Sequence, residues 1–108
     1  MLSLPTAFWH VLAEASATGE FVLPFSVRHI IIGGEHAALD RVRAWQARYG
    51  ERASLLNMYG PTEATITATG YLVPARLPND LLDTPIGHAL PNVHAYVLDT
   101  QLDLVPIG

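Results

Sequence analysis

The first part of the chain alternates two kinds of sequence pattern, and this order limits the folds that it can adopt. Residues 5–19 and 36–50 carry apolar side chains at helical spacing, whereas residues 27–34 and 53–59 contain short, nearly continuous apolar runs. Such runs are typical of strands covered on both faces. Strands separated by helices indicate right-handed crossovers in a parallel sheet. The sequence therefore predicts an α/β fold, with part of a parallel sheet and flanking helices over about residues 1–70.

The second part of the chain has a different character. Residues 64–73 have an extended pattern, and residues 74–92 are rich in proline and polar side chains, which predicts a long surface connection. Residues 93–99 alternate like a strand and lead into a turn. We therefore expect two units, a partial α/β core subdomain over 1–92 and the beginning of a β-rich, barrel-like subdomain over 93–108.

The composition argues against several classes of function. The formal net charge is −4, and six basic residues, all arginine, form no basic run, so nucleic acid is not an expected partner. The sequence has no cysteine, no signal-peptide pattern and no apolar run long enough to cross a membrane, which predicts a cytoplasmic location without a membrane partner. A hydrophobic content of 50% against 15% charged residues suggests a piece of a larger protein.

Glycine-containing loops follow both predicted strands. One is Gly33-Gly34-Glu35, and the other runs from Gly60 to Glu63. Ligands of parallel sheets gather at the carboxyl ends of strands. In the second loop, the Thr62 hydroxyl and the Glu63 carboxylate suit a phosphate with its Mg²⁺ ion, and Tyr59 offers an aromatic face to a planar base. These residue types therefore predict a nucleotide site.

Simpler interpretations explain the same residues. A tight turn in which Thr62 and Glu63 cap a helix accounts for the second loop equally well on composition alone. A glycine pair by itself is better explained as an ordinary loop into a helix that starts near His36. The sequence contains no GxGxxG, P-loop, HExxH or GxSxG motif, and the histidines have no zinc-site spacing.

The segment NMYGPTE, residues 57–63, resembles the N-x-Y-G-P-T-E signature of nonribosomal peptide synthetase adenylation domains, which belong to the adenylate-forming enzyme superfamily. Three further segments resemble that family in the same order: LSLPTAFWHVLAE, IIIGGEHAALDRVRAW and PIGHALPNVHAYVLDTQLDLVPIG. Ala89 departs from the pattern, because the family usually has proline there. The resemblance covers essentially the whole chain and implies an internal fragment of such a domain.

The resemblance implies roles for particular residues. It places an ATP site at Gly34, Glu35, Asn57, Tyr59, Gly60 and Thr62, and an amino-acid pocket at Ser3, Ile31, Gly33, Met58, Ile66 and Thr67. In this assignment Tyr59 stacks on the adenine and Asn57 binds its exocyclic amine. Thr62 and Glu63 are the catalytic residues, with Thr62 contacting the phosphates and Glu63 binding Mg²⁺. The pocket positions are uncharged, which favours a neutral amino acid of small or medium size.

The resemblance also implies a reaction. The parent enzyme activates an amino acid with ATP and Mg²⁺ and passes the aminoacyl-adenylate to the thiol of a phosphopantetheine carrier domain. The family's catalytic lysine is absent from this lysine-free sequence, so we expect the fragment alone to be inactive. Two alternatives remain open: an acyl- or aryl-CoA ligase fragment of the same superfamily, and a non-catalytic interaction piece or remnant.

Overall fold

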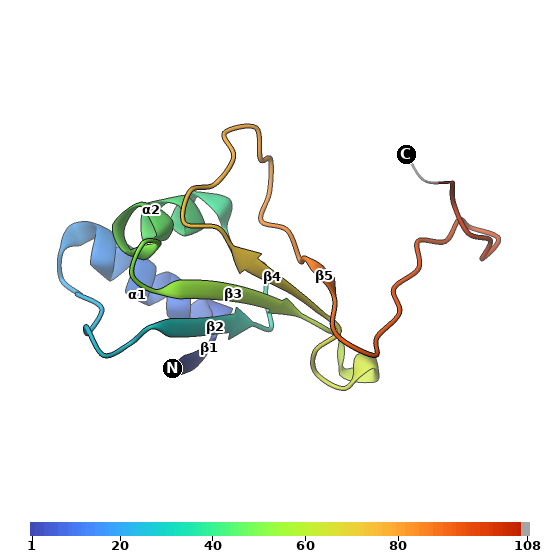
Figure 1. Cartoon of the computed structure of the whole chain (residues 1–108), viewed down its shortest axis with the longest axis horizontal. Coiled ribbons are helices and arrows are strands. Elements are labelled where there is room, and N and C mark those ends of the chain that lie inside the picture. The colour runs from blue at the N-terminus through green and yellow to red at the C-terminus, as the bar shows by residue number, and fades with distance from the viewer. Residues whose placement is uncertain (107–108) are drawn as a thin grey trace.

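The computed structural model describes residues 1–106 and confirms the α/β prediction. Two helices and five strands alternate over most of its length (Figure 1). Their bounds are β1 (Leu2–Pro5), α1 (Thr6–Thr18), β2 (His29–Gly33), α2 (Leu39–Tyr49), β3 (Ser54–Tyr59), the short 3₁₀ helix η1 (Thr62–Ala64), β4 (Thr69–Val73) and β5 (His88–Ala89).

The strands form one mixed sheet in the order β1-β2-β3-β4-β5. The pair β2–β3 is parallel, as predicted. The sequence did not predict β1, which also pairs parallel to β2, whereas β4 and β5 are added antiparallel. The register sets Pro5 opposite Gly33 and Gly33 opposite Met58. The carboxyl ends of the three parallel strands therefore lie at the same edge of the sheet, and both glycine-containing loops leave from that edge.

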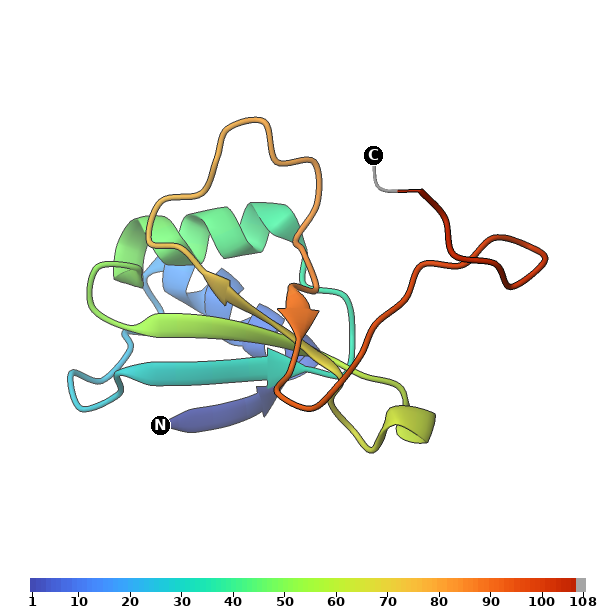
Figure 2. The same ribbon diagram turned by 45° about the vertical axis from the view of Figure 1, so that its right-hand side comes forward.

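Both helices cover the same face of the sheet, as Figures 1 and 2 show. The core between the helices and this face is apolar, and its fully buried side chains include Trp9, Val42, Ile30 and Leu55. On the opposite face, Leu72 remains 63% exposed. The prediction that the strands are covered on both faces is therefore not met by residues 1–106, which supply a layer on one side only.

The helix ends correct one detail of the sequence prediction. Helix α1 begins at Thr6, directly after Pro5, and Gly19 ends it in the left-handed region with φ of 85°. The second helix begins at Leu39 instead of near His36. Residues 34–38 consequently form a loop at the carboxyl edge of the sheet.

The connection between β4 and β5 is fastened to α2. The Arg43 guanidinium donates to the backbone carbonyls of Pro78 and Leu81, at 2.9 and 3.2 Å. The Gln46 amide donates to the carbonyls of Val73 and Pro74, at 3.1 and 2.8 Å. The predicted surface connection is thus ordered along the helix, and it brings residues 83–87 back to the carboxyl edge of the sheet.

Residues 91–106 extend away from the sheet in both views (Figures 1 and 2). The predicted strand at 93–99 is wrong as a continuous strand, since only one bridge, Leu98 to Leu104, forms there. The turn between them is present, because Asp99 accepts the N–H groups of Gln101 and Asp103. The proposed subdomain at 93–108 stays a prediction, and its last two residues lie outside the described chain.

In the part of the chain that the structure describes, no helix is both long and apolar enough to cross a membrane.

Candidate functional site

A cavity of about 500 Å³ opens at the carboxyl ends of β2 and β3. Its walls are the loop after β2, the end of β3 and the segment before β5. The lining residues are Gly34, Glu35, His36, Ala37, Asn57, Met58, Tyr59, Gly60, Pro61, Thr84 and Ile86. The structure therefore brings together all of the residues predicted for the ATP site except Thr62.

A second cavity, of about 590 Å³, lies between β1, β2 and the loop after β3. Its lining consists of Ser3, Leu4, Pro5, Ile31, Ile32, Gly33, Gly34, Met58, Gly60, Thr62, Ile66 and Thr67. Every position predicted for the amino-acid pocket is in this set. None of the lining residues carries a charge, so an ionised side chain placed here would meet no counter-charge from residues 1–106.

The two cavities meet at Gly34, Met58 and Gly60, which line both of them. Two of these three positions are glycines, so Met58 alone of the three contributes a side chain where the cavities join. Gly34 has φ of 94°, a left-handed conformation that strains any residue with a Cβ. A molecule in one cavity can therefore come close to a molecule in the other.

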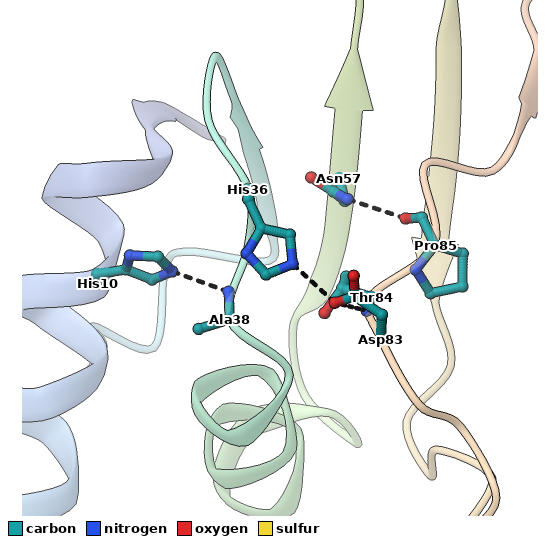
Figure 3. A network of polar contacts seen from close by, with 7 residues as sticks. All are labelled: His10, His36, Ala38, Asn57, Asp83, Thr84 and Pro85. Atoms are coloured by element: carbon teal, nitrogen blue, oxygen red, sulfur yellow. Dashed lines mark hydrogen bonds and ion pairs between the residues drawn. The ribbon is translucent and has the colours of Figure 1, made fainter.

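The first cavity presents one oriented acceptor and one aromatic face. Asn57 is buried, and its Nδ2 donates to the Pro85 carbonyl at 2.9 Å (Figure 3). Because a carbonyl can only accept, this bond fixes the amide orientation and leaves Oδ1 as an acceptor that points away from Pro85. Tyr59 is 49% exposed at the cavity wall. Together they can hold a planar group that has an exocyclic amine.

The predicted catalytic residues lie on η1, beside the cavities. Thr62 lines the second cavity and not the first, whereas Glu63 lines neither of them. Within residues 1–106, Glu63 has no hydrogen bond or ion-pair partner, so its exposed carboxylate is available. No group of three His, Asp or Glu side chains in these residues converges on a common point. A metal ion held by Glu63 would therefore need oxygen ligands from a bound substrate or water.

The sequence matches the family model described as "AMP-binding enzyme" over residues 1–108. The chain belongs to the AMP-binding enzyme family. Two relatives make the match to peptide synthetases specific. The chain is 47% identical over 106 residues to an isonitrile lipopeptide synthase of Streptomyces coeruleorubidus, covering 96% of this chain and 7% of the synthase. It is 37% identical over 103 residues to surfactin synthase subunit 3 of Bacillus subtilis (strain 168), covering 95% of this chain and 8% of that subunit.

Two solved structures have the same fold as this chain. IdnL1 superimposes with a TM-score of 0.78 at 28% identity, covering 96% of this chain and 21% of that chain. PA1221, described as a nonribosomal peptide synthetase protein containing adenylation and carrier-protein domains, gives 0.76 at 24% identity, with 95% and 20% covered. The resemblance to peptide synthetase adenylation domains is therefore confirmed, and the chain spans only a small part of the relatives that it matches.

Sequence reasoning missed the wall of the first cavity that comes from Thr84 and Ile86. These residues lie in the segment interpreted as a surface connection, and no local pattern shows which side of such a connection faces a cavity. His36 was also missed, because the helix was expected to begin there. The one signal that pointed to this wall was the resemblance of residues 85–87 to a motif of the AMP-binding enzyme family.

His10 of α1 holds the loop of residues 34–38 through a hydrogen bond to its backbone. The Ala38 N–H donates to His10 Nε2 at 3.1 Å (Figure 3), so this nitrogen must be unprotonated. Burial lowers the pKa of the His10 imidazole, and the Arg41 guanidinium lowers it further, which outweighs the opposing effect of nearby carboxylates. The fold therefore favours neutral His10, and protonation would remove support from the cavity loop.

We expect acidification to destabilise the wild-type protein more than a His10→Gln variant. Since folding lowers the pKa of His10 below its ordinary value of about 6.5, the unfolded state binds more protons, and stability is lost as the pH falls below about 6.5. The glutamine Oε1 can accept from Ala38 without titrating. In the full-length protein, the melting temperatures of the wild type and His10→Gln should differ by about 1–2 °C more at low pH than at neutral pH. The effect is small because the ring is only partly buried. Parallel melting curves at all pH values would contradict the role assigned to His10.

Proposed function

We propose that this chain forms part of the ATP site and the amino-acid site of an adenylation domain. The observation that carries the proposal is the junction of the two cavities at Gly34, Met58 and Gly60. In the proposed reaction a carboxylate oxygen of the amino acid attacks the α-phosphorus of ATP, the new O–P bond forms, and the bond to pyrophosphate breaks. That attack requires the two substrates to meet, and a junction lined by two glycines leaves room for it.

The first cavity is proposed to hold the nucleotide. The free Oδ1 of Asn57 suits the exocyclic amine of adenine, and the ring of half-exposed Tyr59 suits its face. The backbone at Gly34 and Glu35 would line the other side of the base. This arrangement fits adenine because the cavity offers an acceptor and an aromatic surface close together on one strand.

Phosphate and metal binding are assigned to η1. Thr62 would donate its hydroxyl to a phosphate oxygen, and Glu63 would hold Mg²⁺. The unpaired Glu63 carboxylate, taken within residues 1–106, fits a cation of this kind, because Mg²⁺ is usually bound through one or two carboxylates together with substrate phosphates. When bound, Mg²⁺ supplies charge neutralisation at the phosphate oxygens.

The second cavity is proposed to hold the amino-acid side chain. Ser3, Ile31, Gly33, Met58, Ile66 and Thr67 would contact it. Their uncharged character favours a neutral side chain, since an unpaired charge in such a pocket is costly. The cavity volume of about 590 Å³ lies in the range of small-molecule sites.

The proposed partner is a carrier domain whose phosphopantetheine thiol receives the aminoacyl group, in a cytoplasmic enzyme. Support comes from PA1221, whose adenylation domain is accompanied by a carrier domain. The chain by itself is proposed to be inactive, because it contains no lysine and therefore cannot provide the catalytic lysine implied by the resemblance.

The test is amino-acid-dependent ATP–pyrophosphate exchange by the full-length protein that carries this sequence. We expect exchange with one or a few neutral amino acids of small or medium size, and at least about tenfold less with Asp, Glu, Lys or Arg, because the pocket leaves a charge unpaired. Exchange with fatty or aromatic acids in place of amino acids would overturn the proposal in favour of a CoA ligase. Exchange with a charged amino acid would overturn the assignment of the pocket.

A further inference from the structure

One side-chain contact joins opposite walls of the first cavity. His36 lies on the loop after β2, and Asp83 lies 47 residues further along the chain, in the segment before β5. Their atoms Nε2 and Oδ1 are 2.7 Å apart (Figure 3). The carboxylate can only accept, so the imidazole donates from Nε2. This bond connects the wall formed by residues 34–37 to the wall that contains Thr84 and Ile86.

The same carboxylate oxygen also orders the residue that follows it. Asp83 Oδ1 accepts the Thr84 N–H at 2.7 Å, so one oxygen receives two donors. The pKa of the Asp83 carboxyl is lowered, mainly by the hydrogen bond from His36 and then by the Thr84 N–H. Both donors therefore favour the ionised carboxylate, which makes each hydrogen bond charge-assisted.

The other attachments of this segment do not join the two walls. Arg43 ties the carbonyls of Pro78 and Leu81 to α2, away from the cavity lining. The Asn57–Pro85 bond ties the segment to β3, and the Thr69 hydroxyl ties the Ile86 carbonyl to β4. In residues 1–106, the His36–Asp83 bond is thus the hydrogen bond that spans directly from the loop after β2 to the segment before β5.

We propose that His36 and Asp83 are positioning residues that hold the two walls of the nucleotide cavity together, and so set its affinity for ATP. The inference rests on the proposed function of that cavity. Neither residue is assigned a contact with the reacting atoms. Because the two side chains are 64% and 67% exposed, water competes for the bond, and its contribution should be modest.

The experiment compares Asp83→Ala with the wild type in the full-length protein. We expect the KM for ATP in pyrophosphate exchange to rise about two- to fivefold, the range expected of an exposed ion pair. The KM for the amino acid and the kcat should stay unchanged, because Asp83 lies outside the lining of the second cavity. Asp83→Asn should recover part of the loss, since its amide oxygen can still accept from His36.

Two controls separate positioning from general damage. Asp80→Ala alters an exposed carboxylate of the same segment that has no hydrogen bond or ion pair within residues 1–106, and it should leave the KM for ATP unchanged. A His36→Ala/Asp83→Ala double variant should be no weaker than either single variant, because both changes remove the same contact.

The results that would overturn this inference differ from those that would overturn the proposed function. An unchanged KM for ATP in Asp83→Ala would overturn the inference, and so would an equal rise in the KM for the amino acid. Calorimetric titration with MgATP identifies which proposal has failed. If the wild type does not bind MgATP, the proposed function fails as well. If the wild type and Asp83→Ala bind it equally, the inference alone fails.

Discussion

Replacing Glu63 with alanine in the full-length protein is expected to lower amino-acid-dependent pyrophosphate exchange by about a hundredfold or more, the scale of removing a group that stabilises transition-state charge. Glu63 lies on η1 directly after the junction of the two cavities, and its carboxylate is exposed and unpaired within residues 1–106. No ion pair of these residues is lost with the side chain, so the folded state should tolerate the change. A loss of activity would then report a missing metal ligand.

Two comparisons make this result specific to the metal. Glu63→Asp keeps a carboxylate on a shorter side chain, and we expect added Mg²⁺ to restore its exchange more than that of Glu63→Ala. Glu20→Ala removes another exposed carboxylate, just after α1, and should match the wild type. The measurement is the exchange rate as a function of Mg²⁺ concentration. Near-normal exchange by Glu63→Ala would refute the assignment of Mg²⁺ to this residue.

The helix and strand pattern predicted the central fold because its signals are local. Residues 27–34 and 53–59 contain β2 and β3, and the parallel pairing followed from the helices between them. The edges of the sheet carry weaker signals. β1 has four residues and ends in proline, and β5 has two, so neither is long enough to show a period. Their places depend on pairing with β2 and β4, which is tertiary information.

The candidate site was predictable to the extent that it follows strand ends. Asn57 and Tyr59 lie on β3 and Gly60 directly follows it, so their closeness in space follows from their closeness in the sequence. Thr84 and Ile86 reach the cavity on a segment whose backbone is bound by Arg43, Asn57 and Thr69. Those are contacts between residues far apart in the sequence. The interpretation of residues 74–92 as a polar connection was reasonable in composition and could not show this wall.

Gly60→Ala is expected to damage both cavities at once. A Cβ on Gly60 would lie 2.6 Å from the Thr67 Cα, 2.7 Å from the Ala68 nitrogen and 2.7 Å from the Ile66 carbonyl oxygen. All three are backbone atoms, and the Ala68 N–H is already held by the Tyr59 carbonyl at 2.8 Å. The loop must therefore move. We expect a loss of about 1–3 kcal/mol in the free energy of unfolding, as for other overpacked sites.

The activity should fall further than this loss of stability alone would cause. Gly60 lines both cavities, so a displaced loop changes the separation of the two proposed substrates, and a misplacement of about 1 Å can cost on the order of a hundredfold in rate.

Gly19→Ala is the matched control. Gly19 ends α1 with φ of 85°, and a Cβ added there would meet no atom within 4 Å. Alanine at this position should therefore cost only about 1–2 kcal/mol of backbone strain. Gly19 lines neither cavity. The measurements are thermal melts and exchange rates of both variants. Gly19→Ala should lose stability and keep its KM values. Gly60→Ala should lose exchange by about tenfold to a hundredfold at temperatures where it is fully folded. If the folded Gly60→Ala protein kept wild-type exchange, the junction of the cavities would not be the place where the substrates meet.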